Sequence, residues 1–313
     1  MKVKILLGFL QITTNMAFVV EAPWPSLYAD FLRIFSFVNL DFVPWQSLGC
    51  ATHFTYYTKY LIVSLTPIGV FVGLLLFFLA PNQISLWRAQ RVARELQKRK
   101  FWKLILFTVF LMYPGVSSTV LRFFICKDVA GTQYLLTDFT VECLSEEWYA
   151  HLVLALAMVA LYPVGIPLIF LYFLRRYRDR FDEPEVRLQL GFIYEAYNNE
   201  RWWFEMVDMA HKVCLTALVA FLPFELQMPA GMLVVTLYTM IILLAMPWIR
   251  KGDDRLHLFA QTEIFMMVLA GYTLLSFRTL DEATDVFMSI ILIILTVALF
   301  LLMLLMSAKV TFQ

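Results

Sequence analysis

The feature that most constrains this sequence is an alternation between long apolar runs and links that are by turns rich and poor in Lys and Arg. Hydrophobic residues make up 61% of the 313 residues, and charged residues only 16%. A helix needs about 20 apolar residues to cross the hydrocarbon core of a bilayer. Eight runs meet or approach this length: 5–20, 60–80, 102–121, 149–174, 203–222, 230–248, 258–277 and 286–306.

The length and continuity of these runs predict the fold class. Lipid offers no hydrogen bonds to an exposed backbone, so a spanning segment forms either a helix or a strand of a closed barrel. Barrel strands are shorter and alternate in polarity, which these runs do not. We therefore expect an all-α, polytopic helical membrane bundle with about eight transmembrane helices and some interfacial helices, forming a single domain over 1–313.

The distribution of basic residues predicts the orientation of the chain. The links after the second, fourth and sixth runs are basic, and the remaining links hold few Lys or Arg. Cytoplasmic links retain Lys and Arg, so these three links are expected inside, together with both termini. The basic residues are Arg88, Arg91, Arg94, Lys98, Arg99, Lys100 and Lys103, then Arg175, Arg176, Arg178, Arg180 and Arg187, then Arg250, Lys251 and Arg255, with Lys2, Lys4 and Lys309 near the ends. The membrane is the plasma membrane or an internal one.

Two links between runs carry helical patterns of their own. The link after the second run has a narrow apolar stripe of Leu86, Ala89, Ala93 and Leu96. This stripe indicates an interfacial helix whose basic residues, Arg88, Arg91, Arg94, Lys98, Arg99 and Lys100, face anionic inner-leaflet lipid, each gaining about 1 kcal/mol. A phosphoinositide or effector site is the alternative. The first outside link repeats Leu27, Phe31, Ile34, Val38 and Phe42, which predicts a helix that lies on the membrane or caps the bundle.

The first run is the most polar of the eight. Gln11 and Asn15 lie four residues apart in its centre, and so share one helical face. Such a face usually packs against other helices of the bundle. Lining a polar path is the functional alternative. A secretory signal is a third interpretation, for which the polar centre makes a poor apolar region.

Cysteine placement agrees with the predicted orientation. Cys50, Cys126 and Cys143 fall outside, where the compartment is oxidising, and Cys214 falls in the fifth run. Because Cys126 and Cys143 flank one short loop, we expect a disulfide between them, removing about 3 kcal/mol of chain entropy from the open loop. Metal binding is the alternative, although no CxxC or nearby His supports it.

The fourth run contains the sequence YPVGIP, with Pro163, Gly165 and Pro167. Proline removes a helical hydrogen bond and bends the helix. The residues therefore predict either a fixed kink or a hinge.

The densest group of charged residues opens the fifth run. Glu205, Asp208 and Lys212 follow one another at steps of three and four, and His211 lies beside them. Glu263 is a further acid within an apolar run. Charge within a membrane is costly and marks a functional site by default. Pairing of the acids with Lys212 or Arg201 at the interface is the structural alternative.

Catalytic and cofactor motifs are absent from the sequence. It has no HExxH, GxSxG, Walker A or GxGxxG pattern, and its four His residues do not lie at metal-ligand spacing. We expect neither enzyme activity, a metal nor another cofactor. Nucleic-acid binding is also not expected, because the basic stretch lies between apolar runs.

Three stretches resemble one membrane-protein family. They are FFIC followed by YLLTDFTVEC, then YPVGIPLIF, then LGFIYEAYNNERWWFEMVDMAHKVCLT, all within residues 123–216. They are similar to the TRP-like membrane module of protist and algal Cys-rich-repeat surface proteins, a group that includes the fungal TRP-like flavin-carrier family. The resemblance implies a cation channel or channel-like protein.

The chain also departs from that family. It lacks a large Cys-rich ectodomain, and the links LPFELQMPAG and FRTLDEATD are too short for a pore loop. Conduction would then follow polar faces such as Gln11 with Asn15, or Glu205 with Asp208. Three hypotheses follow: a cation channel or transporter, a structural subunit of a larger complex, and a receptor anchor or lipid-handling protein. Expected partners are membrane lipids and further copies or subunits.

Overall fold

A computed structural model describes residues 2–19, 23–35, 38, 55–76, 91–275 and 282–311. The chain divides into two compact units. Unit 1 comprises Met1–Val43 and Val207–Gln313, and unit 2 comprises Pro44–Met206. Each unit is described by itself.

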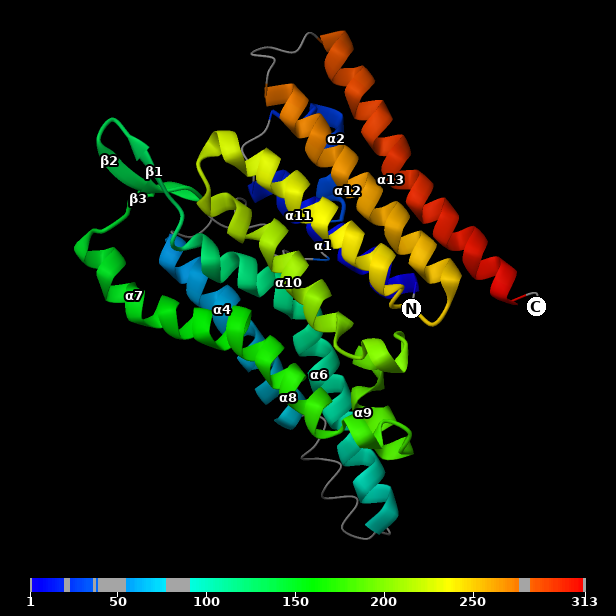
Figure 1. Cartoon of the computed structure of the whole chain (residues 1–313). Coiled ribbons are helices and arrows are strands. Elements are labelled where there is room, and N and C mark those ends of the chain that lie inside the picture. The colour runs from blue at the N-terminus through cyan, green and yellow to red at the C-terminus, as the bar shows by residue number, and fades with distance from the viewer. Residues whose placement is uncertain are drawn as a thin grey trace. The chain divides into compact units, whose positions relative to one another are not determined.

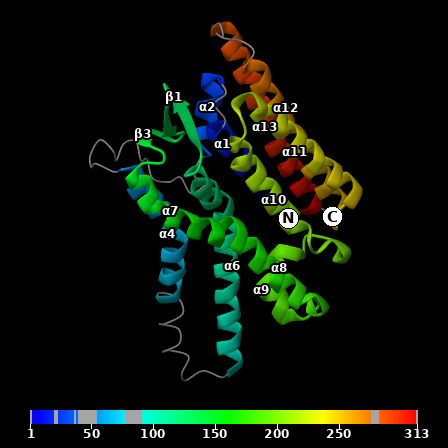
Figure 2. The ribbon, with the colours of Figure 1, turned by 60° about the vertical axis from the view of Figure 1, so that its left-hand side comes forward.

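Unit 1 is a bundle of helices. It contains α1 (Lys2–Val19), α2 (Ser26–Arg33), most of α10 (Phe204–Thr216), a 3-10 turn (Leu218–Phe221), α11 (Phe224–Ala245), α12 (Lys251–Leu275) and α13 (Glu282–Thr311). The long helices α11, α12 and α13 lie side by side (Figures 1 and 2). Because α1 also packs on α12, one long face of α12 is enclosed by its neighbours.

The polar centre of α1 is packed inside unit 1. Every residue from 8 to 17 is buried. Thr13 Oγ1 donates to the Phe9 carbonyl at 3.0 Å, and Asn15 Nδ2 donates to the Gln11 carbonyl at 2.9 Å. These bonds stay within the helix, so the structure agrees with the packing interpretation of this face. Gln11 and Asn15 are both buried rather than placed on an open path.

Helix α2 confirms the helix that was predicted after the first run. It packs against α13 and buries Tyr28 and Leu32. Of the predicted apolar repeat, Leu27 and Ile34 are exposed. Phe42 lies outside the described residues.

Unit 2 combines helices with a small sheet. Its helices are α4 (Tyr56–Leu74), α6 (Arg91–Arg122), α7 (Glu146–Val159), a π-helical segment (Ala160–Gly165), α8 (Ile166–Arg176) and α9 (Pro184–Tyr194). Strands β1 (Cys126–Val129), β2 (Thr132–Leu135) and β3 (Asp138–Glu142) form an antiparallel meander between α6 and α7 (Figure 1). The β1–β2 turn uses Ala130 and Gly131, both at positive φ, as a two-residue hairpin turn requires.

The meander is closed by the predicted disulfide between Cys126 and Cys143. The disulfide prediction is therefore confirmed. Cys214 has a free thiol, and Cys50 lies outside the described residues.

Aromatic side chains form the core beside the meander. Tyr57, Tyr60, Phe123, Trp148 and Ala155 pack together, from α4, the end of α6 and α7. The rings of Phe123 and Trp148 stack with centroids 5.2 Å apart. Such pairs add to the free energy of simple apolar burial.

The first four residues of YPVGIP lie in the π-helical segment that joins α7 to α8, and its last two residues begin α8. A Cβ atom at Gly165 would lie 2.8 Å from the Ala160 carbonyl oxygen, so only glycine fits there without a shift. Tyr162 donates a hydrogen bond to the Ser64 carbonyl of α4 at 2.6 Å. The residues Pro163, Gly165 and Pro167 thus mark an irregular segment that is tied to its neighbour, and motion about it stays a prediction.

The basic link after the second run does not form a separate interfacial helix over its described part. From Arg91 onward it is the beginning of α6, continuous with the apolar run that follows. Helix propagation is favourable once begun, and no Pro or Gly interrupts this stretch before Pro114. Lys98 and Lys100 are exposed, and Arg99 pairs with Glu185 at 2.6 Å. Arg88 and the side chains of Arg91 and Arg94 lie outside the described residues.

Six helices of the described chain are long and apolar enough to cross a membrane. They are Tyr56–Leu74, Lys98–Arg122, Glu146–Arg176, Phe224–Ala245, Lys251–Leu275 and Glu282–Met306. The predicted count of eight spans is not confirmed. The run 5–20 is the 18-residue helix α1, and the run 203–222 is interrupted after Thr216. The fold is mostly helical and compatible with a multi-pass membrane protein.

Candidate functional site

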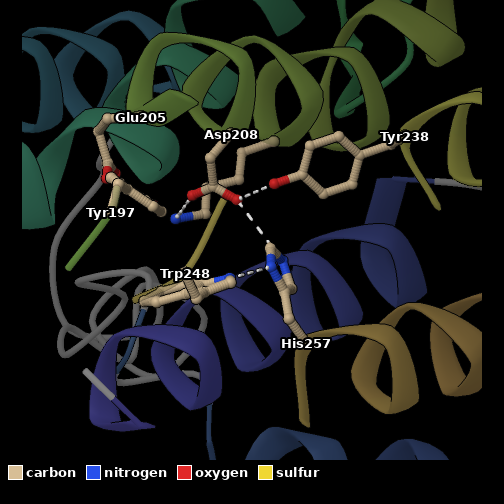
Figure 3. A network of polar contacts seen from close by, with 7 residues as sticks. Tyr197, Glu205, Asp208, Tyr238, Trp248 and His257 are labelled. Carbon is tan, nitrogen blue, oxygen red and sulfur yellow. Dashed lines mark hydrogen bonds and ion pairs between the residues drawn. The ribbon is translucent and has the colours of Figure 1, made fainter. Parts of the chain in front are cut away.

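The most connected polar side chain of unit 1 is the carboxylate of Asp208, on α10. Its Oδ2 lies 2.8 Å from Lys212 Nζ, one helical turn further on. Its Oδ1 accepts a hydrogen bond of 2.7 Å from the Tyr238 hydroxyl of α11. His257 Nε2 of α12 lies 4.0 Å from the same Oδ1 (Figure 3). Three elements therefore converge on one buried carboxylate.

The protonation pattern of His257 follows from its other neighbour. Trp248 Nε1 lies 3.0 Å from His257 Nδ1. An indole nitrogen can only donate, so Nδ1 must be the acceptor. The proton of a neutral His257 is then on Nε2, the atom that faces Asp208. The ring is thus oriented to place its N–H group beside the carboxylate.

Trp248 is held in place by the turn between α11 and α12. Met246 has the left-handed conformation, with φ 39° and ψ 62°, and ends α11. The Trp248 backbone N–H then donates to Asp254 Oδ1 at 3.2 Å. This turn directs the indole toward the polar network (Figure 3).

Lys212 reaches Asp208 along the surface of α1. A Cβ atom at Gly8 would lie 2.9 Å from Lys212 Cε and 3.1 Å from its Nζ. The absence of a side chain at Gly8 therefore makes room for the ammonium group. Lys212 and Asp208 are nearly buried, with side-chain exposures of 5% and 11%. Their charges cancel within the bundle.

His211 lies on the other side of Tyr238. Its ring stacks on the phenol with centroids 3.8 Å apart, and it is 4% exposed. Neither ring nitrogen has a hydrogen-bond partner among the described residues. The contacts of His211 are therefore those of a packed aromatic ring.

Glu205 belongs to unit 2 and is described apart from this network. It is fully buried in the first turn of α10, and its Oε2 accepts a hydrogen bond of 2.9 Å from Tyr197. The predicted pairing with Lys212 is shown for Asp208 but not for Glu205.

Glu263 is the remaining predicted acid. It lies at the middle of α12 and is 6% exposed. The structure does not bring it into the Asp208 network. Glu263 is therefore a separate acidic position of unit 1.

Sequence reasoning missed three members of the network: Tyr238, Trp248 and His257. A signal was present for His257, because Asp254, His257 and Gln261 recur at steps of three and four in an apolar helix, and all are buried. Tyr238 and Trp248 gave no signal, since isolated aromatic residues are common in membrane helices and at their ends.

The described residues contain no group of three or more His, Cys, Asp or Glu placed to hold a metal ion. The network is instead an ion pair surrounded by hydrogen-bonding aromatic side chains. Such an arrangement can stabilise the carboxylate of Asp208 in an apolar bundle, or exchange its cationic partner.

Comparison with known proteins gave no match. No protein-family model matches the chain, and neither a curated protein nor a solved structure does. The function is therefore argued from the chain itself.

Proposed function

We propose that this chain is a membrane protein that moves cations, as a channel or a transporter, and that it is related to the TRP-like proteins that its sequence resembles. Six apolar helices support the membrane location. The acids Glu205, Asp208 and Glu263 supply negative charge inside apolar helices, with His211 and Lys212 beside Asp208. The polar face of Gln11 and Asn15 is a further candidate for the path.

The observation that carries this proposal is the burial of Asp208. A charged carboxylate within an apolar bundle is costly, and proteins keep such groups chiefly where they bind or conduct charge. Asp208 has a cationic partner, a phenol donor and an imidazole within 4.0 Å. A monovalent cation that displaced Lys212 Nζ would meet the same carboxylate oxygen, Asp208 Oδ2.

The basic links support an orientation with both termini in the cytoplasm. The Cys126–Cys143 disulfide favours an oxidising compartment for the meander. Arg175 and Arg176 end α8, while Arg250 and Lys251 come after α11. These two basic links share one side of the membrane only if the chain crosses once between α8 and α11. The proposal therefore includes crossings by α10 and by α1, giving eight.

The outer faces of the long helices favour a second candidate function. Leu233, Leu237 and Leu244 of α11 are exposed, as are Ile294 and Leu301 of α13. Such faces contact lipid or another membrane subunit. A non-transporting subunit of a larger complex, or a homo-oligomer, is thus the alternative, with anionic lipid as a partner of the basic residues.

Reconstitution into liposomes tests the proposal. We expect monovalent cation flux from the wild-type protein, and at least a tenfold lower flux from Asp208→Asn, because that variant loses the charge but keeps the shape. Glu225→Gln is the matched control, because it removes an exposed carboxylate from the same unit. Flux at the level of empty liposomes from folded wild-type protein would favour the structural subunit.

A further inference from the structure

Glu263 is a second buried acid of unit 1, and its surroundings differ from those of Asp208. Glu263 lies at the middle of α12, halfway along a helix long and apolar enough to span a membrane. It is 6% exposed, and neither Oε1 nor Oε2 has a hydrogen-bond partner among the described residues. Asp208, in contrast, has partners on both carboxylate oxygens.

A polar neighbour of Glu263 comes from another helix of unit 1. Tyr28 of α2 interacts electrostatically with Glu263, and its hydroxyl forms a hydrogen bond with Thr296 of α13. Burial raises the pKa of Tyr28 to about 12, against the opposing effect of the Thr296 hydrogen bond. Tyr28 is therefore a neutral phenol and supplies no counter-charge.

The hydroxyl protons of Tyr28 and Thr296 are both donated in other hydrogen bonds. Thr296 Oγ1 donates to the Leu292 carbonyl at 3.0 Å, within its own helix. A threonine hydroxyl has a single proton, so Tyr28 is the donor of the bond that the two residues share. The Tyr28 hydroxyl then offers Glu263 only lone pairs, which can accept a hydrogen bond from a protonated carboxyl group but donate none to a carboxylate.

No described cation is placed to neutralise Glu263. The charged groups of the elements packed around α12 lie elsewhere: Lys2 and Lys4 begin α1, Glu225 begins α11, Glu282 and Asp285 begin α13, Asp30 pairs with Arg33 on α2, and Asp208 pairs with Lys212. On α12 itself, Lys251, Asp253, Asp254, Arg255 and His257 lie six to twelve residues before Glu263, and both Lys251 and Arg255 are exposed. The cluster near Asp208 and the position of Glu263 are thus electrostatically separate sites.

An isolated carboxylate in an apolar interior is too costly to persist, and the group takes up a cation to become neutral. A metal cation such as Na⁺ or Ca²⁺ requires several oxygen ligands at once. The two hydroxyls described here hydrogen-bond to each other, and the backbone around Glu263 is helical. A proton requires only the carboxylate.

We propose that Glu263 is a proton-binding site in the membrane interior, with its carboxyl group protonated at neutral pH and close to the Tyr28 hydroxyl. Its ligand is a proton delivered from water. As a step in cation movement, this site rests on the function proposed above, where it would exchange its proton for the transported charge. As a protonation state it does not depend on transport.

Infrared spectroscopy of the wild-type protein in lipid tests the assignment. A protonated carboxylic acid has a carbonyl band well separated from those of carboxylates and amides, and this band shifts when the sample is exchanged into D₂O. We expect the band at neutral pH in the wild type and its loss at strongly alkaline pH. Glu263→Gln should lack the band. Glu263→Asp should keep it at a shifted frequency, and Asp208→Asn should keep it unchanged.

The outcomes separate this inference from the proposed function. The same carboxylic acid band in wild type and in folded Glu263→Gln would overturn the assignment, and so would the absence of the band from the wild type. Loss of the band on adding Na⁺ at constant pH would also overturn it, because a metal cation would then replace the proton. If Glu263→Gln does not fold, the shift expected for Glu263→Asp, whose carboxyl is one methylene shorter, decides the assignment. The band requires no flux, so its presence in a protein without flux would sustain the inference and reject transport.

Discussion

The two units contain ion pairs of opposite exposure, and unit 1 also has the exposed Arg33–Asp30 pair. Unit 1 buries the Asp208–Lys212 pair, with side-chain exposures of 11% and 5%. In unit 2, Arg180 and Glu183 pair at 2.6 Å while being 50% and 42% exposed. The stability of unit 2 comes instead from the aromatic core around Phe123 and Trp148, and from the disulfide.

This difference indicates which unit holds charged groups for a functional reason. Exposed ion pairs contribute little to stability and cost little to remove. A buried pair contributes little net stability, yet the loss of one partner leaves an uncompensated charge in an apolar interior. Unit 1 therefore maintains a costly arrangement, and unit 2 resembles a scaffold. Glu205 is the exception in unit 2, fully buried on the helix through which the chain passes to unit 1.

The largest expected effect is that of removing the ammonium group from unit 1. Lys212→Met should lower the free energy of unfolding by about 3–5 kcal/mol, because Asp208 stays buried without its cation. Denaturant titration in mixed micelles measures this. The double variant Lys212→Met with Asp208→Asn should recover most of the loss, and an additive result would refute the coupling.

Loss of the disulfide should have the next largest effect, confined to unit 2. Cys126→Ser with Cys143→Ser opens a loop with a sequence separation of 17, which costs about 3 kcal/mol by chain entropy. We expect faster amide hydrogen exchange over 126–143 and unchanged exchange in α12. Cys214→Ser is the matched control. Equal protection with and without the disulfide would show that the meander is held by packing alone.

Trp248→Phe should have a moderate effect within unit 1. It removes the donor to His257 Nδ1 while keeping an aromatic ring, at a cost of about 1–2 kcal/mol. The released His257 can take either tautomer, so ¹⁵N chemical shifts of its ring should change. An unchanged Nδ1 shift would argue against the assigned hydrogen bond. Trp202→Phe in unit 2 is the control.

The smallest expected effect comes from the exposed pair of unit 2. Hydrogen bonding to Arg180 lowers the pKa of Glu183, so any stabilisation by this pair is present above the usual glutamate pKa and is lost as the pH falls. Because both groups are solvent-exposed, Arg180→Gln should leave the unfolding midpoint unchanged at neutral pH and moderate salt. A clear drop would contradict the contrast between the units.

Much of the fold follows from the sequence because apolar length is a strong signal. The runs at 60–80, 102–121, 149–174, 230–248, 258–277 and 286–306 each correspond to a described helix that is long and apolar enough to cross a membrane, and the prediction of the Cys126–Cys143 disulfide is confirmed. The run 203–222 was less predictable. Its hydropathy is continuous, yet α10 ends at Thr216 and a 3-10 turn follows. Hydropathy measures composition alone, so it does not detect such a change in backbone hydrogen bonding.

The candidate site was predicted only in part. Asp208 and Lys212 are neighbours on one helix, so their pairing follows from a spacing of four. Tyr238 and His257 reach Asp208 from other helices, and no local pattern specifies which helices pack together. For the same reason, the separation of Glu263 from the Asp208 network required the structure.

The most direct test of this account is to compare its two buried acids by one method. Unfolding free energies of Asp208→Asn and Glu263→Gln are measured in the same micelles at neutral pH. We predict that Asp208→Asn lowers the free energy of unfolding by about 3 kcal/mol or more, because Lys212 then stays buried without its carboxylate partner. For Glu263→Gln we predict a loss in unfolding free energy of about 1 kcal/mol or less, because a neutral amide replaces a neutral acid. Equal losses for the two variants would contradict the claim that unit 1 holds one acid charged and the other protonated.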